Sequence, residues 1–430
     1  MLGDKKSHGL WEASAPTPPA TAPLQEDLSV DVAIIGGGFT GCSAGLHLAR
    51  NGVSVAVLEG NEIGFGGSGR NVGLVNAGMW VQPQDVLKEL GDVYGNRLLT
   101  QLGAGPAYVF ELVNSYNMQC EAVPNGTLHC AVGQSGLEEI KAREVQWKAL
   151  GAPVEVLSAE ETARRTGTNA YTGALLDKRA GTIQPLAYVR ELSKAAIQEG
   201  VKLYTHTRVK HYEESGDGYV VRTESGHSVK AKWVVLATNA YSAEDSNLPK
   251  LREELVHLPY FNFATKPLSA DQKARVLPGR EGAWDTCEIL TSFRFDQQDR
   301  LVFGSVGALR GMGSNIHKDW AKRAMYKLFP FLKGVEFDYE WFGMIGMTPN
   351  NLPRFHMPGK RVISFSGYNG RGISPGTVFG REIARLILGE VSTSEMPLPL
   401  SEIDEASFRG VKELYYEVGS QVAHAATARL

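Results

Sequence analysis

The sequence lacks the features that mark several classes of protein. No run of about 18 apolar residues occurs, so we expect no transmembrane segment. The N-terminal stretch has no apolar core of the kind that a secretory signal carries. The net charge is −3 and no basic cluster stands out, which argues against a nucleic-acid partner. We therefore expect a cytoplasmic protein and leave peripheral attachment to a membrane open.

Cysteine is scarce as well. The four cysteines, Cys42, Cys120, Cys130 and Cys287, form no Cys-x-x-Cys pair and have no metal-ligand spacing. Cys120 and Cys130 flank a turn signal at 124–126, and a two-residue turn would place their side chains on opposite sheet faces, which disfavours a disulfide. The ten histidines show no zinc spacing and no Ser-His-Asp set. We predict no metal site and no hydrolytic mechanism.

Glycine, by contrast, is abundant: its 48 occurrences among 430 residues suggest tight turns and close approach of backbone to a ligand. A chain of this length exceeds one compact core, so we expect two domains or one interrupted domain. The stretch Ala13–Pro23 is rich in Ala, Pro and Thr and predicts an extended arm over the surface. Trp11 either anchors this arm or belongs to a disordered end.

The most specific motif follows a short buried strand at Val32–Ile35. Gly36, Gly38 and Gly41 fit G-x-G-x-x-G and open a helix that ends at 51–52. The first glycine allows the tight turn, the second lets backbone approach a pyrophosphate, and the third lets helix pack on strand. The helix N-terminus offers N–H groups and partial positive charge to phosphates. This run predicts a dinucleotide site.

The next strand, Val53–Leu58, ends on Glu59, an acid placed to accept hydrogen bonds from ribose hydroxyls. An acid here disfavours the 2′-phosphate of NADP. A second small-residue loop, Ser68–Gly73, would bring several backbone N–H groups and one cation to a long ligand, which an NAD site does not need. We therefore favour FAD, with an NAD-dependent dehydrogenase as the alternative that a colourless protein would support.

With these two loops the sequence resembles the D-amino-acid-oxidase-like superfamily of FAD-dependent oxidoreductases, in which a GASGRNGG-type loop follows the dinucleotide motif. The likeness is greatest to the branch that contains gamma-glutamylputrescine oxidase, glycine and sarcosine oxidases and bacterial L-pipecolate oxidase. It extends from Leu10 to about Gly389. Gly67 and Val72 depart from the usual alanine and glycine where the flavin is expected to pass.

Later segments follow the family's order. They are Tyr171–Pro185, Lys202–Val209, Trp233–Ala240, Trp341–Pro353 and Ser366–Ser374, the last of which contains a GYNGRG element. A predicted helix from Pro375 to Leu388 comes next. In the family its N-terminus points at the flavin ring, where the helix dipole would stabilise negative charge on the reduced flavin.

The resemblance implies an α/β (α+β) fold: a Rossmann-like FAD-binding domain of glutathione-reductase type with an inserted mixed β-sheet substrate domain. The expected divisions are an N-terminal arm at 1–27, a discontinuous FAD-binding domain at 28–90, 158–244 and 341–400, a substrate-binding domain at 91–157 and 245–340, and a C-terminal amphipathic helix within 401–430 that begins near Ser401.

The residues expected to contact FAD lie in the loops described above. They are Gly36, Gly38, Phe39, Thr40, Gly41, Glu59, Gly60, Ser68, Gly69, Arg70, Asn71, Val72, Gly73, Leu74, Val209, Ala237, Thr238, Asn239, Gly343, Gly370, Arg371, Gly372, Ile373 and Ser374. We expect noncovalent FAD, because the flavin-linking cysteine of sarcosine oxidase has no evident counterpart.

The implied chemistry is hydride transfer from the carbon next to an amine nitrogen to flavin N5, which leaves an imine. A free amine can drive this step without a strong base, so we assign no catalytic residue. Arg294, on a strand that matches the family's YFR strand, is the first candidate for a substrate carboxylate, with Arg371 or Arg354 next. An ordinary structural salt bridge is the alternative for Arg294.

Further pocket candidates are Tyr260, Phe261, Tyr368 and Lys266, the last as a cation that promotes oxygen reduction. Core packing is the alternative for the aromatic residues. The stretch 258–263 is rich in aromatic residues and no acid occurs between His257 and Ala270. We therefore favour a cyclic secondary amino acid such as L-pipecolate, an intermediate of lysine catabolism, or proline.

Two alternatives stay open for function. One is the oxidation of gamma-glutamylputrescine or another polyamine conjugate. The other is a flavin-carrying subunit of a dehydrogenase that passes electrons to a quinone, although the sequence has no cysteine cluster for an iron–sulfur centre. The electron acceptor, oxygen or a quinone, is not decided by the sequence.

Overall fold

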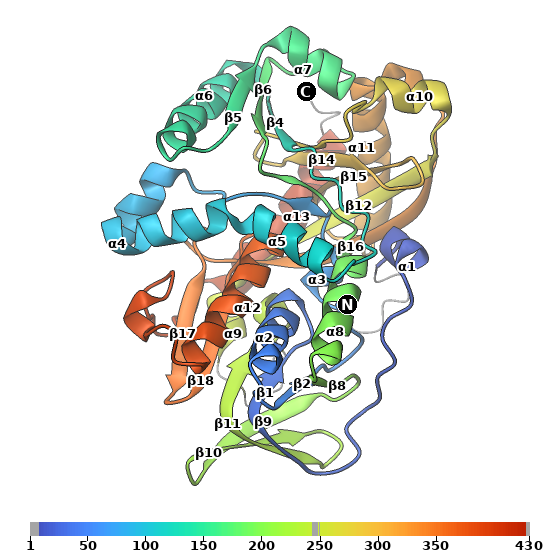
Figure 1. Ribbon diagram of the computed structural model, residues 1–430. Helices are drawn as coiled ribbons and strands as arrows, with labels where there is room; N and C mark the ends of the chain where they lie inside the picture. The colour runs from blue at the N-terminus through green and yellow to red at the C-terminus, as the bar shows by residue number, and fades with distance from the viewer. Residues whose placement is uncertain (1–7, 243–247, 249, 427–430) are drawn as a thin grey trace.

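The computed structural model describes residues 8–242, 248 and 250–426. Two eight-stranded sheets lie one above the other, with helices packed around them (Figure 1). The predicted α/β class with a second, mixed sheet is confirmed. Residues 1–7 of the predicted arm, 427–430 of the C-terminal segment and the expected boundary at 244–245 lie outside the described residues.

The lower sheet in Figure 1 has the order β17-β18-β11-β1-β2-β8, with β10 and then β9 attached to β11. Its strands are β1 (Leu28–Ile35), β2 (Val55–Leu58), β8 (Lys202–Tyr204), β9 (Val209–Ser215), β10 (Gly218–Thr223), β11 (Ser228–Leu236), β17 (Arg354–Gly359) and β18 (Val362–Ser366). β8, β2, β1, β11 and β18 are parallel neighbours. Because layers cover both faces of this parallel part, β1 ends in the four-residue buried run Val32–Ile35.

Three helices cover one face of this sheet. α2 (Phe39–Arg50) packs against both α8 (Pro185–Gln198) and α12 (Ile373–Ile387). β1 and β11 pair side by side in the same direction, so the loops after Ile35 and Leu236 meet at one edge of the sheet. Ligands of open α/β sheets bind in the crevice at this carboxyl edge.

The upper sheet has the order β16-β12-β15-β14-β13-β4-β6-β5. Its strands are β4 (Thr127–Ala131), β5 (Val154–Leu157), β6 (Gly173–Asp177), β12 (Val256–Pro267), β13 (Gly282–Asp285), β14 (Thr291–Phe295), β15 (Arg300–Val306) and β16 (Phe337–Met347). β6 and the second half of β16 pair with strands of this upper sheet. The expected divisions at 158 and 341 place both segments in the FAD-binding domain. Each forms backbone hydrogen bonds with a neighbouring strand of the substrate-binding domain. The chain therefore passes from that domain to the FAD-binding domain later than the sequence motifs suggested.

The N-terminal arm begins with α1 (Leu10–Ser14), which is docked on the protein. Trp11 is fully buried, and its Nε1–H donates to the carbonyl of Asn71 at 2.9 Å. Gln184 Nε2 donates to the Trp11 carbonyl at 2.9 Å. Of the two readings of Trp11, the structure therefore supports the anchor.

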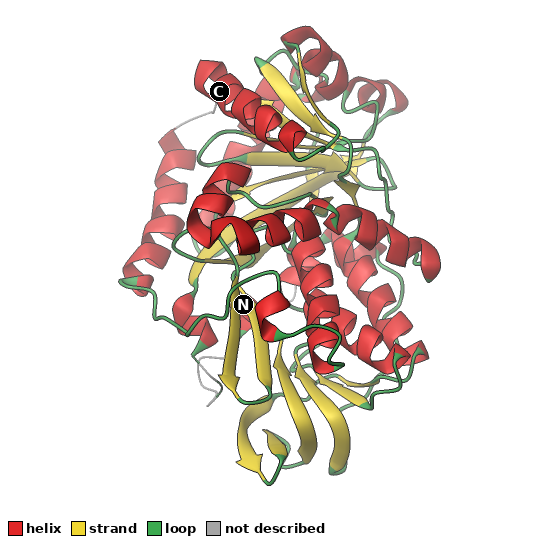
Figure 2. Cartoon of the chain, turned by 60° about the vertical axis from the view of Figure 1, so that its left-hand side comes forward, coloured by secondary structure: helices red, strands yellow, loops and turns green. Residues whose placement is uncertain are grey.

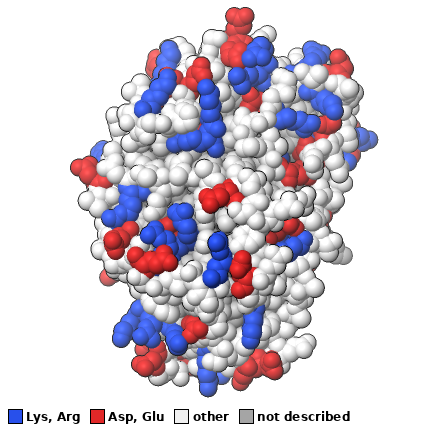
Figure 3. Space-filling view, viewed as in Figure 1, with Lys and Arg blue, Asp and Glu red and all other residues white. Residues whose placement is uncertain are grey.

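The C-terminal helix, α13, spans Arg409–Ala426, so it begins later than Ser401. No helix in the described part of the chain is both long and apolar enough to cross a bilayer. Figure 2 shows helices lying on both sides of the two sheets. On the face drawn in Figure 3, basic and acidic side chains are interspersed and no large patch of one sign forms.

Candidate active site

A cavity of about 1120 Å³ lies at the carboxyl edge of the lower sheet and is also lined by strands of the upper sheet. Most residues predicted to contact FAD line it. They are Gly36, Gly38, Phe39, Thr40, Glu59, Gly60, Ser68, Arg70, Asn71, Val72, Leu74, Val209, Ala237, Thr238, Asn239, Gly343, Gly370, Arg371, Gly372 and Ile373. The sequence motifs therefore converge on one site.

The dinucleotide end of the cavity is made of closely spaced backbone. Gly36 has φ 111°, and a Cβ there would lie 2.8 Å from the carbonyl oxygen of Ala237. A Cβ on Gly41 would collide with the carbonyl of Gly36, so helix α2 can start this close to β1 only with glycine at that position. The turn leaves the N-terminus of α2 facing the cavity, where its free N–H groups suit a pyrophosphate.

Glu59 lies at the end of β2 and lines the same end. Its Oε2 accepts from the Gly37 N–H at 2.7 Å, and its Oε1 accepts from the Asn61 N–H at 2.9 Å. Burial raises the pKa of Glu59, and these two hydrogen bonds oppose that rise. Each carboxylate oxygen keeps a lone pair that can accept from a ribose hydroxyl.

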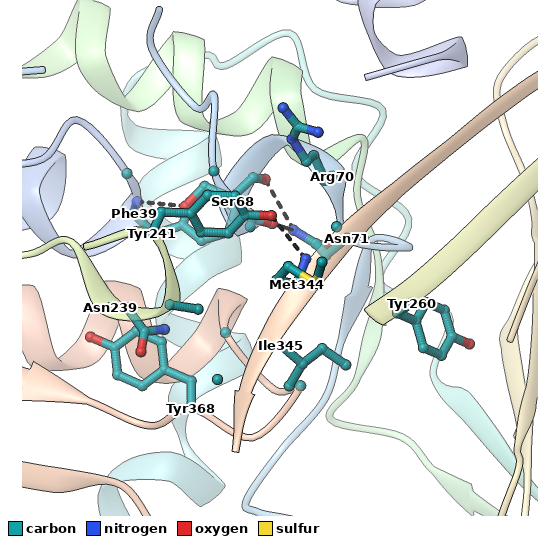
Figure 4. Close-up of a pocket in the computed structure, with 18 of the residues that line it drawn as sticks. Phe39, Ser68, Arg70, Asn71, Asn239, Tyr241, Tyr260, Met344, Ile345 and Tyr368 are labelled. Atoms are coloured by element: carbon teal, nitrogen blue, oxygen red, sulfur yellow. Dashed lines mark hydrogen bonds between the residues drawn. The ribbon is translucent and has the colours of Figure 1, made fainter. Parts of the chain in front are cut away.

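The second small-residue loop is a short helical turn, α3 (Gly67–Arg70), that packs against the first motif. Ser68 Oγ accepts from the Phe39 N–H at 3.1 Å (Figure 4). Asn71 Oδ1 accepts from the Gly73 N–H at 2.9 Å. Arg70 is fully buried, and its Nε donates to the Phe65 carbonyl at 2.7 Å. The α1 contact to Asn71 braces this loop from outside.

Four predicted contact residues do not line the cavity but support residues that do. Gly41 and Gly69 allow close backbone approach to Gly36 and Gly64, respectively. Gly73 has φ 84° and lies against the Ile183 carbonyl. Ser374 Oγ donates to the Asn76 carbonyl at 3.0 Å.

The middle of the cavity is bordered by the N-terminus of α12 and by the backbone of β16. Tyr368 comes just before α12, and its hydroxyl lies 2.7 Å from Thr40 Oγ1. Tyr241 accepts the Met344 N–H at 2.9 Å on the opposite wall (Figure 4). Burial raises the pKa of both tyrosines, so both are neutral at physiological pH. The start of α12 carries partial positive charge towards the cavity.

These features fit an FAD molecule. Two helix N-termini face the cavity, a buried carboxylate lies where the ribose is expected, and the glycine turns leave no room for side chains. Val209, at the start of β9, also lines the cavity. The residues that would hold the cofactor are therefore those of the lining set named above.

The substrate end of the cavity is formed by side chains. Arg371 lies with its Cζ 5.2 Å from the ring centres of both Trp80 and Trp284. One guanidinium nitrogen donates to the Ala77 carbonyl at 2.8 Å. The buried donors Arg371 Nε and Trp284 Nε1 have no hydrogen-bond partner within the described chain.

Arg371 is a buried cation without an ion pair to any carboxylate of the described residues. Burial, reinforced by repulsion from Arg143, lowers the pKa of Arg371 to about 9. The guanidinium is therefore charged at neutral pH, and a buried charge without a partner is costly. An anion entering the cavity would pair with this charge.

The other substrate candidates divide by strand alternation. Tyr260 on β12 lines the cavity, with its hydroxyl 2.7 Å from Ser292 Oγ. Phe261 points to the other face, where it packs 5.2 Å from Phe263 between ring centres. Lys266 is exposed near the end of β12 and is not part of the cavity wall.

Arg294 does not fit the predicted role in binding a substrate carboxylate. It is fully buried on β14 and outside the cavity wall. Its Nε donates to the Phe295 carbonyl at 2.9 Å, and NH1 donates to the carbonyls of Gly73 and Ile183. Backbone carbonyl oxygens therefore accept the hydrogen bonds that the Arg294 guanidinium donates. Arg354 is also outside the wall and donates to the Leu352 carbonyl at 3.1 Å.

Among the lining residues that were not identified from the sequence are Trp80, Trp284, Cys287 and Glu288. Trp80 closely follows the second glycine-rich loop, and Trp284 alternates with core residues on β13. These positions are weak signals in a sequence, because they come from separate segments and carry no motif. Only the fold brings them to one cavity.

Comparison with known proteins agrees with this site. The family model described as "FAD dependent oxidoreductase" matches residues 31–386. The gamma-glutamylputrescine oxidoreductase of Escherichia coli is 30% identical over 92% of this chain and 94% of that protein. A probable oxidoreductase, OrdL, of Haemophilus influenzae is 29% identical over 93% and 92%.

Solved structures share the fold at lower identity. Glycine oxidase from Geobacillus kaustophilus has a TM-score of 0.69 at 20% identity, covering 85% of this chain and 96% of that one. L-proline dehydrogenase from P. horikoshii has a TM-score of 0.67 at 18% identity, covering 87% and 98%. With its motifs gathered on one dinucleotide cavity, the chain belongs to the FAD dependent oxidoreductase family, known as DAO.

Proposed function

We propose that this enzyme oxidises the C–N bond of an amino acid whose carboxylate binds Arg371. The observation that carries the proposal is the buried guanidinium of Arg371, which lines the cavity and has no ion pair to a described carboxylate. A carboxylate is the anion that a guanidinium binds in the fork geometry that arginine favours. No described residue supplies an ion pair there.

Each part of the wall has a role in this proposal. Arg371 holds the carboxylate, and the rings of Trp80 and Trp284 exclude water around the ion pair. Tyr260 forms part of the cavity wall that the upper sheet contributes. Bound FAD supplies the hydride acceptor, and the imine product then hydrolyses in water.

A cyclic secondary amino acid, such as L-pipecolate or proline, is our preferred substrate. Trp80, Trp284 and Tyr260 offer aromatic surface to a compact apolar ring. The carboxylate and the ring nitrogen of such a substrate are separated by one carbon, so fixing the carboxylate also fixes the reacting carbon.

A second candidate is gamma-glutamylputrescine, and one residue favours it. Glu288 lines the cavity and is exposed, so it is placed to receive a distant ammonium group. The Escherichia coli relative carries that substrate in its name. Its carboxylate would occupy Arg371 while the polyamine end reaches Glu288.

Anaerobic mixing with each compound tests the choice. Loss of the flavin's visible absorbance with L-pipecolate or proline, and none with gamma-glutamylputrescine, supports the cyclic substrate. The reverse result supports the second candidate, and Glu288→Gln should then raise KM for the polyamine conjugate alone. Bleaching by neither compound, but by amines that lack a carboxylate, would contradict the role of Arg371.

We also propose that FAD is held noncovalently. Cys42, Cys120 and Cys130 are buried outside the cavity, and Cys287 is the cysteine that lines it. Acid precipitation should leave yellow FAD in the supernatant, whereas a yellow pellet would indicate a covalent link. Reoxidation of the bleached enzyme by air or by a soluble quinone then identifies the acceptor.

A further inference from the structure

The C-terminal helix α13 buries its polar side and exposes its apolar side. Among its buried or half-buried residues are Glu413, Glu417, Ser420 and His424. An ordinary surface helix has the opposite arrangement, with its apolar stripe against the core. This inversion requires an explanation.

The buried side of α13 is fixed by charged and polar contacts. Glu413 accepts from Arg252 at 2.7 Å and from the His257 N–H at 2.9 Å. Glu417 accepts from Arg310 Nε at 2.7 Å. These contacts set which face of the helix points inward. They also connect α13 to the cavity wall, because all three basic partners line it.

A further polar contact, between two imidazole rings, lies nearer the C-terminal end of the helix. His424 Nδ1 is 2.8 Å from His317 Nδ1, and the His424 ring stacks on Trp320 at 3.9 Å between centres. The helix therefore has no freedom to turn its apolar side inward without breaking three sets of polar contacts.

The outward side carries a continuous apolar stripe. We call Val411, Leu414, Tyr415, Val418 and Val422 the outer stripe; their exposed fractions are 67%, 63%, 68%, 46% and 63%. Phe408, 80% exposed, directly precedes the helix. Single exposed apolar residues are common, but a contiguous patch marks an interaction site.

We propose that the outer stripe is the contact between two copies of this chain, packed antiparallel about a two-fold axis. Val411, Tyr415, Val418 and Val422 are spaced by four, three and four residues. This spacing is the same from either end of the helix. A copy that runs in the opposite direction therefore presents a matching stripe, as a two-fold interface requires.

The register that follows from this spacing has no conflict. Val411 of one copy lies opposite Val422 of the other, and Tyr415 lies opposite Val418. Leu414 lies opposite Gly419, which has no side chain to prevent close approach. Lys412 lies opposite Gln421, so no like charges meet.

The area suits a modest dimer. The five residues of the outer stripe and Phe408 each expose about 100 Å². Roughly 600 Å² per copy would therefore be buried, compared with the ~800 Å² per partner of a standard interface. A lipid surface fits less well. Arg409 and Lys412 are the basic residues beside the stripe, and Asp404 with Glu405 precede it, whereas anionic membranes attract clusters of basic residues.

The first test is the mass of the full-length, flavin-loaded protein by sedimentation velocity over a dilution series. We expect twice the chain mass of 46.7 kDa at high concentration. Val418→Asp, at the centre of the stripe, should raise the dissociation constant at least tenfold while flavin content stays unchanged. Val145→Asp on α6 (Gly133–Ala149), a residue 68% exposed, is the matched control and should remain dimeric.

Cysteine pairs test the register. A mixture of Val411→Cys and Val422→Cys proteins should form a disulfide-linked dimer, whereas neither variant should do so alone. In the proposed pairing two Val411 positions are 11 residues apart along the axis, or about 16 Å at 1.5 Å per residue. Cys42, Cys120 and Cys130 are buried and will not compete, and the partly exposed Cys287 is replaced by serine in both variants.

Three results would overturn the proposal. They are a monomer at every concentration, a dimer that Val418→Asp leaves intact, and crosslinking of either single-cysteine variant by itself. Flotation of a monomeric wild type with phosphatidylcholine–phosphatidylglycerol vesicles would assign the stripe to a membrane instead.

Discussion

The two ends of the cavity are built in different ways. At the dinucleotide end, Gly36, Gly38 and the N-terminus of α2 present backbone, and Glu59 adds one carboxylate. At the substrate end, Trp80, Trp284 and Arg371 present side chains from distant segments. Backbone recognition needs a contiguous run with fixed spacing. Side-chain recognition needs only that the fold bring residues together, which leaves no pattern in the sequence.

Two arginines show the same contrast. Arg294 and Arg371 are both buried, and burial lowers the pKa of each guanidinium. The guanidinium of Arg294 donates to backbone carbonyls, whereas Arg371 lines the cavity. The first therefore stabilises the fold and the second is available to a ligand.

The largest effect is expected from Arg371→Met. Removing the buried partner of a carboxylate costs about 3–4 kcal/mol, so kcat/KM should fall by roughly 200- to 1000-fold for an amino-acid substrate. Steady-state kinetics measures the fall, and circular dichroism should show an unchanged fold. Arg354→Met, outside the cavity wall, is the control and should behave as wild type. Equal kinetics for both variants would contradict the assignment.

Glu59→Lys should weaken the other end of the cavity. The variant loses charge-assisted hydrogen bonds worth about 1.5–3 kcal/mol and places a cation that accepts nothing next to the ribose. FAD retention after dilution and gel filtration should drop at least tenfold. Glu62→Lys, at a nearby exposed acid, should retain the cofactor. Full occupancy in Glu59→Lys would remove the residue from the FAD site.

Arg294→Met should change stability and leave catalysis alone. The variant loses the hydrogen bonds to the carbonyls of Phe295, Gly73 and Ile183 and leaves these buried acceptors without a donor. The free energy of unfolding should fall by about 2–3 kcal/mol. Denaturant unfolding measures the loss, while KM for a carboxylate substrate should stay within about twofold. A large rise in KM with normal stability would return the carboxylate role to Arg294.

Acid should destabilise the α13 side of the molecule. Burial lowers the pKa of His317 to about 4 and that of His424 to about 3, from an unfolded value near 6.5. Below pH 6.5 the unfolded chain binds protons that the folded chain excludes, so stability is complete above that pH and falls towards pH 4. Unfolding at pH 7 and 5 should differ by about 2 kcal/mol for each histidine. In His317→Asn/His424→Asn this difference should shrink; an unchanged difference would exclude the pair as its source.

The smallest effect is expected from Lys266→Met. Lys266 is exposed and lies outside the cavity wall. Reoxidation of the reduced enzyme by oxygen, followed by stopped flow, should stay within about twofold of wild type, as for other surface substitutions. A drop of an order of magnitude would restore the role in oxygen reduction that the sequence suggested.

The sequence by itself determined the α/β class, the dinucleotide end of the cavity and the family. The glycine spacing after β1, the acid at the end of β2 and the loop at Ser68–Gly73 each dictate a local backbone shape, and local shape can be read from contiguous residues. Strand alternation could also have separated Tyr260 from Phe261, because neighbours on a strand face opposite sides.

Only the tertiary structure decided which cation faces the cavity, where β6 and β16 pair, and which side of α13 is exposed. The linear sequence placed Arg294 ahead of Arg371 as the carboxylate ligand, because the carbonyls that accept from Arg294 belong to Gly73 and Ile183, far away in the chain. The amphipathic pattern of α13 predicted a helix. Its charged side faces inward because Arg252 and Arg310 lie there and donate hydrogen bonds to the glutamates of the helix. Partners of this kind are properties of the assembled fold.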